Sequence, residues 1–131
     1  MIEHHKKLAY AYFDAVKNSE LPDSLLTDDM TAWTTTTGTV DKNTYQAMVK
    51  MLGKMCAAPL TITVHSLTAE DDRVIAEAES KGKLINGEDY CNTYIFVFRI
   101  RDNRIAAVAE HYNALIARDK LLPLMKDVSM N

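Results

Sequence analysis

Residues 90–112 read YCNTYIFVFRIRDNRIAAVAEHY, and this stretch decides the fold. Two runs rich in β-branched and aromatic residues, Tyr90–Arg101 and Arg104–Tyr112, flank the dipeptide Asp102-Asn103. Such residues favour strands, while Asp and Asn tolerate the backbone of a tight turn. The stretch therefore predicts two long antiparallel strands joined by a tight turn.

The preceding segment keeps the same period of two residues. Apolar and polar residues alternate over Leu60–Thr68 and again over Arg73–Ile85, with an acidic turn at residues 70–72 between them. Asn86-Gly87 then gives a strong hairpin signal, because both residues tolerate positive φ. Together these patterns predict an antiparallel meander that continues to Tyr112.

Helical periodicity dominates the N-terminal half, where apolar residues recur at i, i+3 and i+4. The expected elements are a helix over Glu3–Lys17, a short helix from Pro22 to Leu26, a strand over Met30–Thr37, a helix from its cap Asp41 to Cys56 and, after the meander, a tail helix over Ala114–Leu122 that ends before Pro123. Helices that precede an antiparallel meander indicate the α+β class, with helices packed on the concave face of a curved sheet. A ligand would occupy the open mouth that such packing leaves.

The composition suits a single domain over residues 1–131. Of the 131 residues 47% are hydrophobic, and the formal net charge is −3. Lys and Arg are scattered, which argues against nucleic acid or a membrane surface as the partner. No segment approaches the length of a membrane span, and the first residues lack an apolar run, so we expect neither a membrane helix nor a secretory signal.

The chain contains no sequence motif that is typical of redox-active cysteines or of a metal site. Cys56 and Cys91 have no CxxC spacing, so we expect both to be reduced and buried, as in a cytoplasmic protein. No spacing of His, Cys, Asp or Glu matches a metal site, and no glycine-rich phosphate loop is present. We therefore expect neither a metal nor a cofactor.

Glu110 is the main candidate for chemistry. On strand alternation it shares one side with Ala106, Val108 and Tyr112, in a segment that otherwise reads as buried. A carboxylate on a core-facing side costs stability unless it is paired, hydrogen-bonded, solvated by a cavity or protonated. Glu110 is therefore either a general acid/base in a pocket or a structurally paired carboxylate.

The order of elements resembles the nuclear-transport-factor-2-like superfamily, also called the SnoaL-like or ketosteroid-isomerase-like fold. The resemblance covers nearly the whole chain, and three segments carry it: YFDAVKNSE at 12–20, LTDDMTAW at 26–33 and the closing residues 101–113. It implies a cone-shaped barrel of a strongly curved, mostly antiparallel sheet, with three N-terminal helices packed on the concave face. Because this fold hosts enzymes, binders and interaction domains, it does not name a reaction.

The resemblance transfers few catalytic residues. In ketosteroid isomerases a first-helix tyrosine stabilises the oxyanion, and Tyr12 falls at that place. Their catalytic base and their oxyanion aspartic acid fall on Thr34 and Phe96, so that chemistry is not expected here. Limonene-epoxide-hydrolase-like proteins and SnoaL-like cyclases use an acidic residue near the end of the sheet, and Glu110 falls there. The arginine and aspartate of the hydrolase triad fall on Ala78 and Ser80.

Further residues are expected to surround a ligand beside Glu110 and Tyr12. Tyr94 and Phe96 would form an aromatic wall, and Met48 a soft one, although each could equally be core. The predicted substrate-binding set is Trp33, Met48, His65, Tyr94, Phe96 and Tyr112.

Three functions compete for this chain. The first is an enzyme without a cofactor, an isomerase, dehydratase, cyclase or hydrolase that uses Glu110 on an apolar substrate. The second is a non-catalytic binder of a hydrophobic small molecule, and the third is an interaction domain. A homodimer through the open face of the sheet is what the resemblance implies. The substrate and the pathway are not encoded in these patterns.

Overall fold

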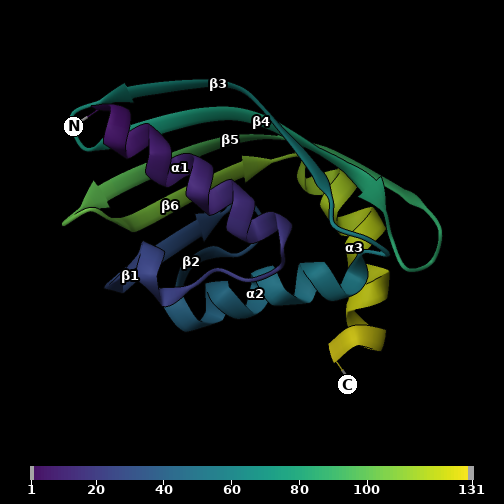
Figure 1. Cartoon of the computed structure of the whole chain (residues 1–131). Coiled ribbons are helices and arrows are strands. Elements are labelled where there is room, and N and C mark those ends of the chain that lie inside the picture. The colour runs from purple at the N-terminus through teal and green to yellow at the C-terminus, as the bar shows by residue number, and fades with distance from the viewer. Residues whose placement is uncertain (1, 130–131) are drawn as a thin grey trace.

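The computed structural model describes residues 2–129, with side chains for residues 2–125. Within this range three α-helices and one short 3-10 turn accompany a single six-stranded sheet (Figure 1). In chain order the elements are α1 (Ile2–Lys17), η1 (Asp23–Leu25), β1 (Leu26–Thr34), β2 (Gly38–Asp41), α2 (Lys42–Met55), β3 (Thr61–Glu70), β4 (Arg73–Lys83), β5 (Asp89–Arg101), β6 (Arg104–Tyr112) and α3 (Ala114–Ser129). The α+β class and the C-terminal meander are confirmed.

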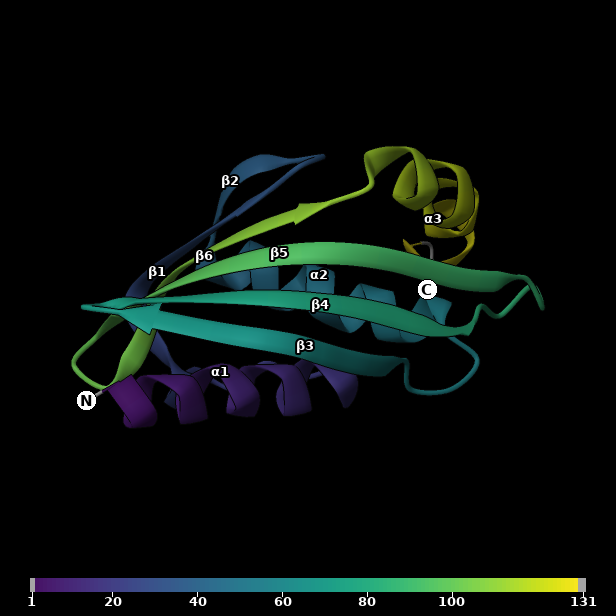
Figure 2. The same ribbon diagram turned by 90° about the horizontal axis from the view of Figure 1, so that it is seen from above.

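The sheet has the strand order β2-β1-β6-β5-β4-β3. All neighbouring strands are antiparallel except β1 and β6, which run parallel. No ladder joins the two edge strands β2 and β3, so the sheet is not closed, and the predicted cone-shaped barrel is wrong in this respect. Helix α1 packs against β3 and β4, and α2 packs against β1 and β2. Both helices therefore lie on the same face of the sheet, which we call its inner face (Figures 1 and 2).

The tail helix and the second helix differ from the prediction. Helix α3 runs through Pro123 to Ser129 instead of ending before the proline. A proline inside a helix loses a backbone hydrogen bond, but Leu124 is buried against Leu84 and Tyr90, and this packing offsets that loss. The predicted second helix is only the 3-10 turn η1, so two α-helices, α1 and α2, precede the meander instead of three, and the third, α3, follows it.

Strand β2 was not predicted, because its four residues lie between a strand closed by Gly38 and the helix cap Asp41, where the sequence pattern indicates a turn. Gly38 begins it at a φ of +69°, and each of its residues pairs with β1. Strand β1 also begins earlier than expected, at Leu26. Its first residues read as polar, but Leu26 pairs with Ile105 of β6 and both are fully buried.

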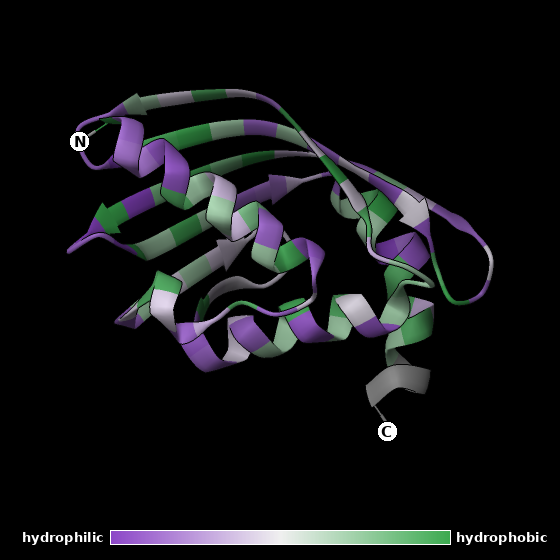
Figure 3. Ribbon diagram, in the orientation of Figure 1, coloured by the Kyte–Doolittle hydropathy of each residue, from purple (hydrophilic) through white to green (hydrophobic). Residues whose placement is uncertain are grey.

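Hydrophobic and hydrophilic residues alternate along the strands (Figure 3). On β6 the alternation contains a bulge: Ala107 is opposite Arg99 but Ile105 is opposite Ile100, which leaves Ala106 as the extra residue. Ile105 is therefore the residue that enters the core, and the predicted inward position of Ala106 is wrong. Val108, Glu110 and Tyr112 keep the inward side.

The outer face of the sheet carries exposed apolar side chains. Trp33, Ile75 and Ile95 are each more than a third exposed, and the Trp33 ring lies 4.6 Å from the ring of His111. Cys91 also faces outward and is exposed, so the prediction that both cysteines are buried is wrong. The homodimer and the cytoplasmic location stay predictions. No helix within residues 2–129 combines the length and the apolarity needed to cross a bilayer.

Helix α2 passes close to the chain that leaves α1. A Cβ placed on Gly53 would lie 2.0 Å from Oγ and 2.3 Å from Cβ of Ser19, whose backbone has a φ of +63°. Glycine at position 53 is therefore required by this approach, although it weakens a helix in general.

Replacing Gly53 by Ala is expected to destabilise the protein by about 1–3 kcal/mol, because overpacking outweighs the gain in helix propensity. The same change in a Ser19→Gly background should cost little, since the next atom, Cα of residue 19, lies 3.6 Å away. Chemical denaturation of the wild type, the two single variants and the double variant measures the coupling free energy between positions 19 and 53. Equal costs of Gly53→Ala in both backgrounds would contradict this packing.

Candidate functional site

A cavity of about 770 Å³ lies between the sheet and the helices. Its lining comes from the last turns of α1, from α2 and the loop after it, from the inner faces of β4, β5 and β6, and from one side of α3. The volume is in the range of small-molecule pockets, and most of the lining is apolar.

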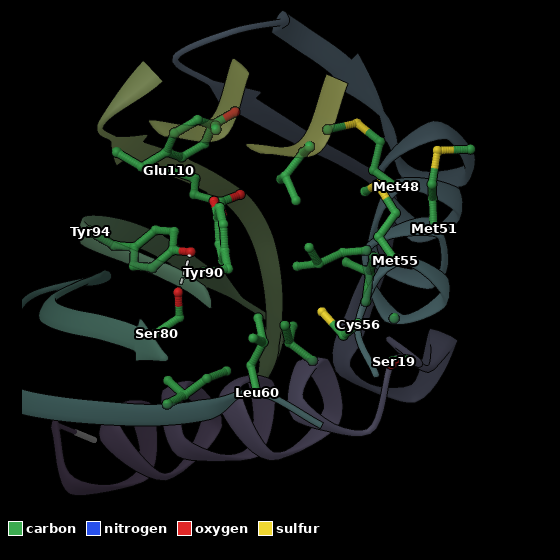
Figure 4. A pocket seen from close by; sticks show the side chains of 18 of the residues that line it. Ser19, Met48, Met51, Met55, Cys56, Leu60, Ser80, Tyr90, Tyr94 and Glu110 are labelled. Carbon is green, nitrogen blue, oxygen red and sulfur yellow. Dashed lines mark hydrogen bonds between the residues drawn. The ribbon is translucent and has the colours of Figure 1, made fainter. Parts of the chain in front are cut away.

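Two walls of different chemistry face each other across the cavity (Figure 4). One wall, the helix wall, is formed by α2, where residues at i, i+3 and i+7 lie on the same side of the helix. Its sulfur-bearing residues are Met48, Met51, Met55 and, at the end of the helix, Cys56. The strand wall carries oxygen atoms, because alternate residues of the strands point inward; its polar members are Ser80, Tyr90, Tyr94 and Glu110.

Glu110 lies on the strand wall, where its strand register places it opposite Phe96. The Tyr45 hydroxyl of α2 donates a hydrogen bond to Oε2 of Glu110 at 3.0 Å. Tyr12 of α1 forms a further hydrogen bond with the Tyr45 hydroxyl. Three elements that are far apart in sequence thus meet at one carboxylate. No Lys, Arg or His among the described residues forms an ion pair with Glu110.

Burial raises the pKa of Glu110 to about 7, and the hydrogen bond from Tyr45 opposes that rise. Burial, together with the nearby Glu110 charge, also raises the pKa values of Tyr12 and Tyr45 well above 10. Both phenols therefore keep their protons. With Glu110 ionised, Tyr45 uses its single proton for the carboxylate, so Tyr12 is the donor to the Tyr45 oxygen. The result is a directed chain from Tyr12 through Tyr45 to Glu110.

A second polar pair lies on the same strand wall. The hydroxyls of Ser80 and Tyr94 are 2.8 Å apart, and both residues line the cavity. On β6, the Tyr112 hydroxyl donates to Oγ1 of Thr34 at 3.2 Å. One of the two protons of the Ser80–Tyr94 pair stays free to bind an oxygen atom of a ligand, whereas the Tyr112 hydroxyl is already bonded to Thr34 and Thr36.

The structure brings most of the predicted site residues together. Glu110 and Tyr12 line the cavity, as do four of the predicted substrate-binding residues: Met48, Tyr94, Phe96 and Tyr112. Tyr12 is only 1% exposed, and its hydroxyl is directed to Tyr45. Tyr12 therefore reaches Glu110 only through Tyr45.

Trp33 and His65 do not line the cavity. Trp33 occupies the outer face of β1, against His111. Nε2 of His65 lies 3.2 Å from Oε1 of Glu79, and the His65 side chain is 53% exposed. A register shift between Val64 and Ser66 accompanies this placement on β3.

Tyr45 is the functional candidate that the sequence analysis did not single out. It belongs to the buried stripe of α2 and is 2% exposed. A tyrosine on a buried stripe needs a hydrogen-bond partner for its hydroxyl, and this requirement is the sequence feature that could have marked Tyr45 as a site residue. Within the described residues, no group of three or more His, Cys, Asp or Glu side chains is arranged to hold a metal ion.

The chain belongs to the SnoaL-like domain family, whose model matches residues 9–108. No curated protein matches the sequence. Solved structures share the fold at low identity. The LEH-like epoxide hydrolase of M. tuberculosis superposes with a TM-score of 0.74 at 14% identity, over 98% of this chain and 97% of that one. PrhC from Penicillium brasilianum gives a TM-score of 0.79 at 13% identity, over 98% and 93%. An NTF2-like protein from Anabaena variabilis gives 0.73 at 18%, over 85% and 90%.

Replacing Glu110 by Gln is expected to remove a pH dependence of the free energy of unfolding. The pKa of Glu110 is about 7 in the folded protein and 4.5 ordinarily. Between these values the folded state binds more protons than the unfolded state, so stability falls as the pH rises. Wild type should lose about 2–3 kcal/mol more than Glu110→Gln between pH 5 and pH 8.

Denaturant titrations at several pH values measure this difference. Glu70→Gln is the matched control, because Glu70 is exposed at the end of β3 and its removal should leave the wild-type slope intact. Identical pH profiles for wild type and Glu110→Gln would mean that Glu110 titrates like a solvated carboxyl.

Proposed function

We propose that this SnoaL-like protein is an enzyme that uses Glu110 as a general acid/base on a mostly apolar small molecule. The observation that supports the proposal is a carboxyl group on the wall of an apolar cavity, with a pKa of about 7 and no cationic partner among the described residues. Carboxylates that serve only structure are usually paired with a cation, which lowers their pKa.

A pKa near neutrality suits proton transfer in both directions. At pH 7 both the protonated and the ionised forms of Glu110 are present, so the same group can take a proton from a substrate and return it elsewhere. A substrate that fills the mostly apolar cavity displaces water, which strengthens its interaction with the carboxyl group.

Tyr45 and Tyr12 position the acid/base. The bond from Tyr45 engages Oε2 of Glu110 and leaves Oε1 for the substrate. Tyr12 in turn fixes the Tyr45 hydroxyl from the core side. Both act as neutral donors that hold the carboxylate in one orientation.

In isomerisation and aldol-type cyclisation an acid/base takes a proton from a carbon beside a carbonyl group, and in hydrolysis it takes one from water. In dehydration it removes a C–H proton or protonates the departing hydroxyl, so a single carboxyl group can serve each of these reactions. The ketosteroid-isomerase route is not supported, because Thr34 stands at the place of the base. Thr34 is 1% exposed, and its hydroxyl is bonded to Thr37. The alternative is a non-catalytic binder of a hydrophobic molecule, for which the methionine wall is equally suited.

Incubation with panels of apolar epoxides, enones and hydroxy ketones, followed by mass spectrometry and chiral chromatography, tests the proposal. Any conversion should fall by about 10²–10⁴-fold in Glu110→Gln, and its pH profile should inflect near 7. Glu70→Gln should keep full activity.

Two outcomes would contradict the proposed role of Glu110. Turnover that persists in Glu110→Gln would remove the carboxylate from the mechanism. Saturable binding of these compounds without any conversion over long incubation would favour the binder instead.

A further inference from the structure

Charged side chains are rare in the cavity lining, and two of them are cations. Lys17 lies in the last turn of α1, and Arg118 lies on the side of α3 that faces the cavity. The remaining charged residue of the lining is Glu110. Lys17 and Arg118 are both exposed, so they lie where the cavity lining meets solvent. Glu110 lies on the strand wall (Figure 4).

Neither cation is neutralised by another residue of the lining. Lys17 forms no ion pair with any described residue, and the partner of Arg118 is its chain neighbour Asp119, with Nε and Oδ1 3.4 Å apart. Arg118 is also the one position of charge on a stripe of α3 that is otherwise apolar: Ala114, Leu115, Ala117, Leu121, Leu122 and Met125.

This local charge is opposite in sign to that of the whole chain, which is −3. Cations at the opening of a low-dielectric cleft concentrate the field there and attract anions. An anion that entered as far as the strand wall would be repelled by ionised Glu110, so it gains most by staying at the opening.

We propose that the natural ligand is an apolar monoanion that binds in one orientation. Its anionic group, a carboxylate, a sulfonate or a phosphate diester, lies at the opening near Lys17 and Arg118. Its apolar body fills the space between the methionine wall and the strand wall, and a neutral oxygen function reaches Glu110 and Tyr45. The contact of the neutral oxygen with Glu110 rests on the function proposed above, whereas the contact of the anionic group with Lys17 and Arg118 does not.

Two fluorescent compounds that differ by one charged group provide the test. 8-Anilinonaphthalene-1-sulfonate carries a sulfonate, and N-phenyl-1-naphthylamine has the same ring system without it. Protein labelled with ¹³C at the methionine methyl groups reports binding in this cavity alone, through the signals of Met48, Met51 and Met55. Dissociation constants are taken from those signals at low and at high salt.

The sulfonate is expected to bind the wild-type protein more tightly than the neutral compound at low salt, and to lose that advantage at high salt. The double variant Lys17→Glu, Arg118→Glu should weaken sulfonate binding by about tenfold or more and change binding of the neutral compound by less than about twofold. The control Lys7→Glu, Arg104→Glu carries the same change in net charge on exposed residues outside the lining, and should behave as wild type.

The results separate this inference from the proposed function. Equal binding of both compounds, unchanged in the double variant, would overturn the anionic ligand and leave the role of Glu110 standing. An equal loss of sulfonate binding in the control variant would also overturn it, because net charge would then be the cause. Methionine signals that respond to neither compound would overturn the apolar ligand and, with it, both proposals.

Discussion

The hydrogen bond from Tyr45 to Glu110 is the interaction on which the site depends. A carboxylate turned into an apolar cavity must be compensated, and here a neutral phenol does so in place of a cation. A guanidinium in the same position would have held the pKa of Glu110 low and made it a structural anion. A phenol orients the carboxylate and allows it to accept a proton near neutral pH.

The fold delivers the three members of this chain to one point. Glu110 faces inward because β6 pairs with β5 in a register that sets it opposite Phe96, and the bulge at Ala106 adjusts the strand before that point. Helix α1 is anchored to β5: Tyr12 lies 4.9 Å from Phe98, ring centre to ring centre. Such edge-to-face contacts add to the burial of the rings and fix the Tyr12 hydroxyl beside Tyr45. Core packing and site geometry are thus one arrangement.

The sequence was informative where a periodic pattern extends over many residues. The two long strands around Asp102-Asn103 and the helix capped by Asp41 follow from local periodicity and capping, and the structure has them at nearly the predicted bounds. The inward direction of Glu110 follows from the same alternation. Each of these features is decided by neighbours along the chain.

The features that the sequence did not predict depend on contacts between distant residues. The helix continues through Pro123 because Leu124 packs against the β4–β5 hairpin. Strand β2 forms because its four residues pair with the edge of β1. The sheet is open between β2 and β3, and alternation along single strands does not reveal which strands form its edges. Tyr45 looked like an ordinary core residue, since only the folded chain shows that its hydroxyl meets Glu110.

The most direct test of the central claim is a titration of the Glu110 carboxyl carbon by ¹³C NMR, assigned by its absence in Glu110→Gln. An inward carboxyl held only by a phenol should titrate with a midpoint near 7. A midpoint at or below the ordinary value of 4.5 would show that Glu110 is solvated or paired with a cation in solution, and the acid/base proposal would fall with it.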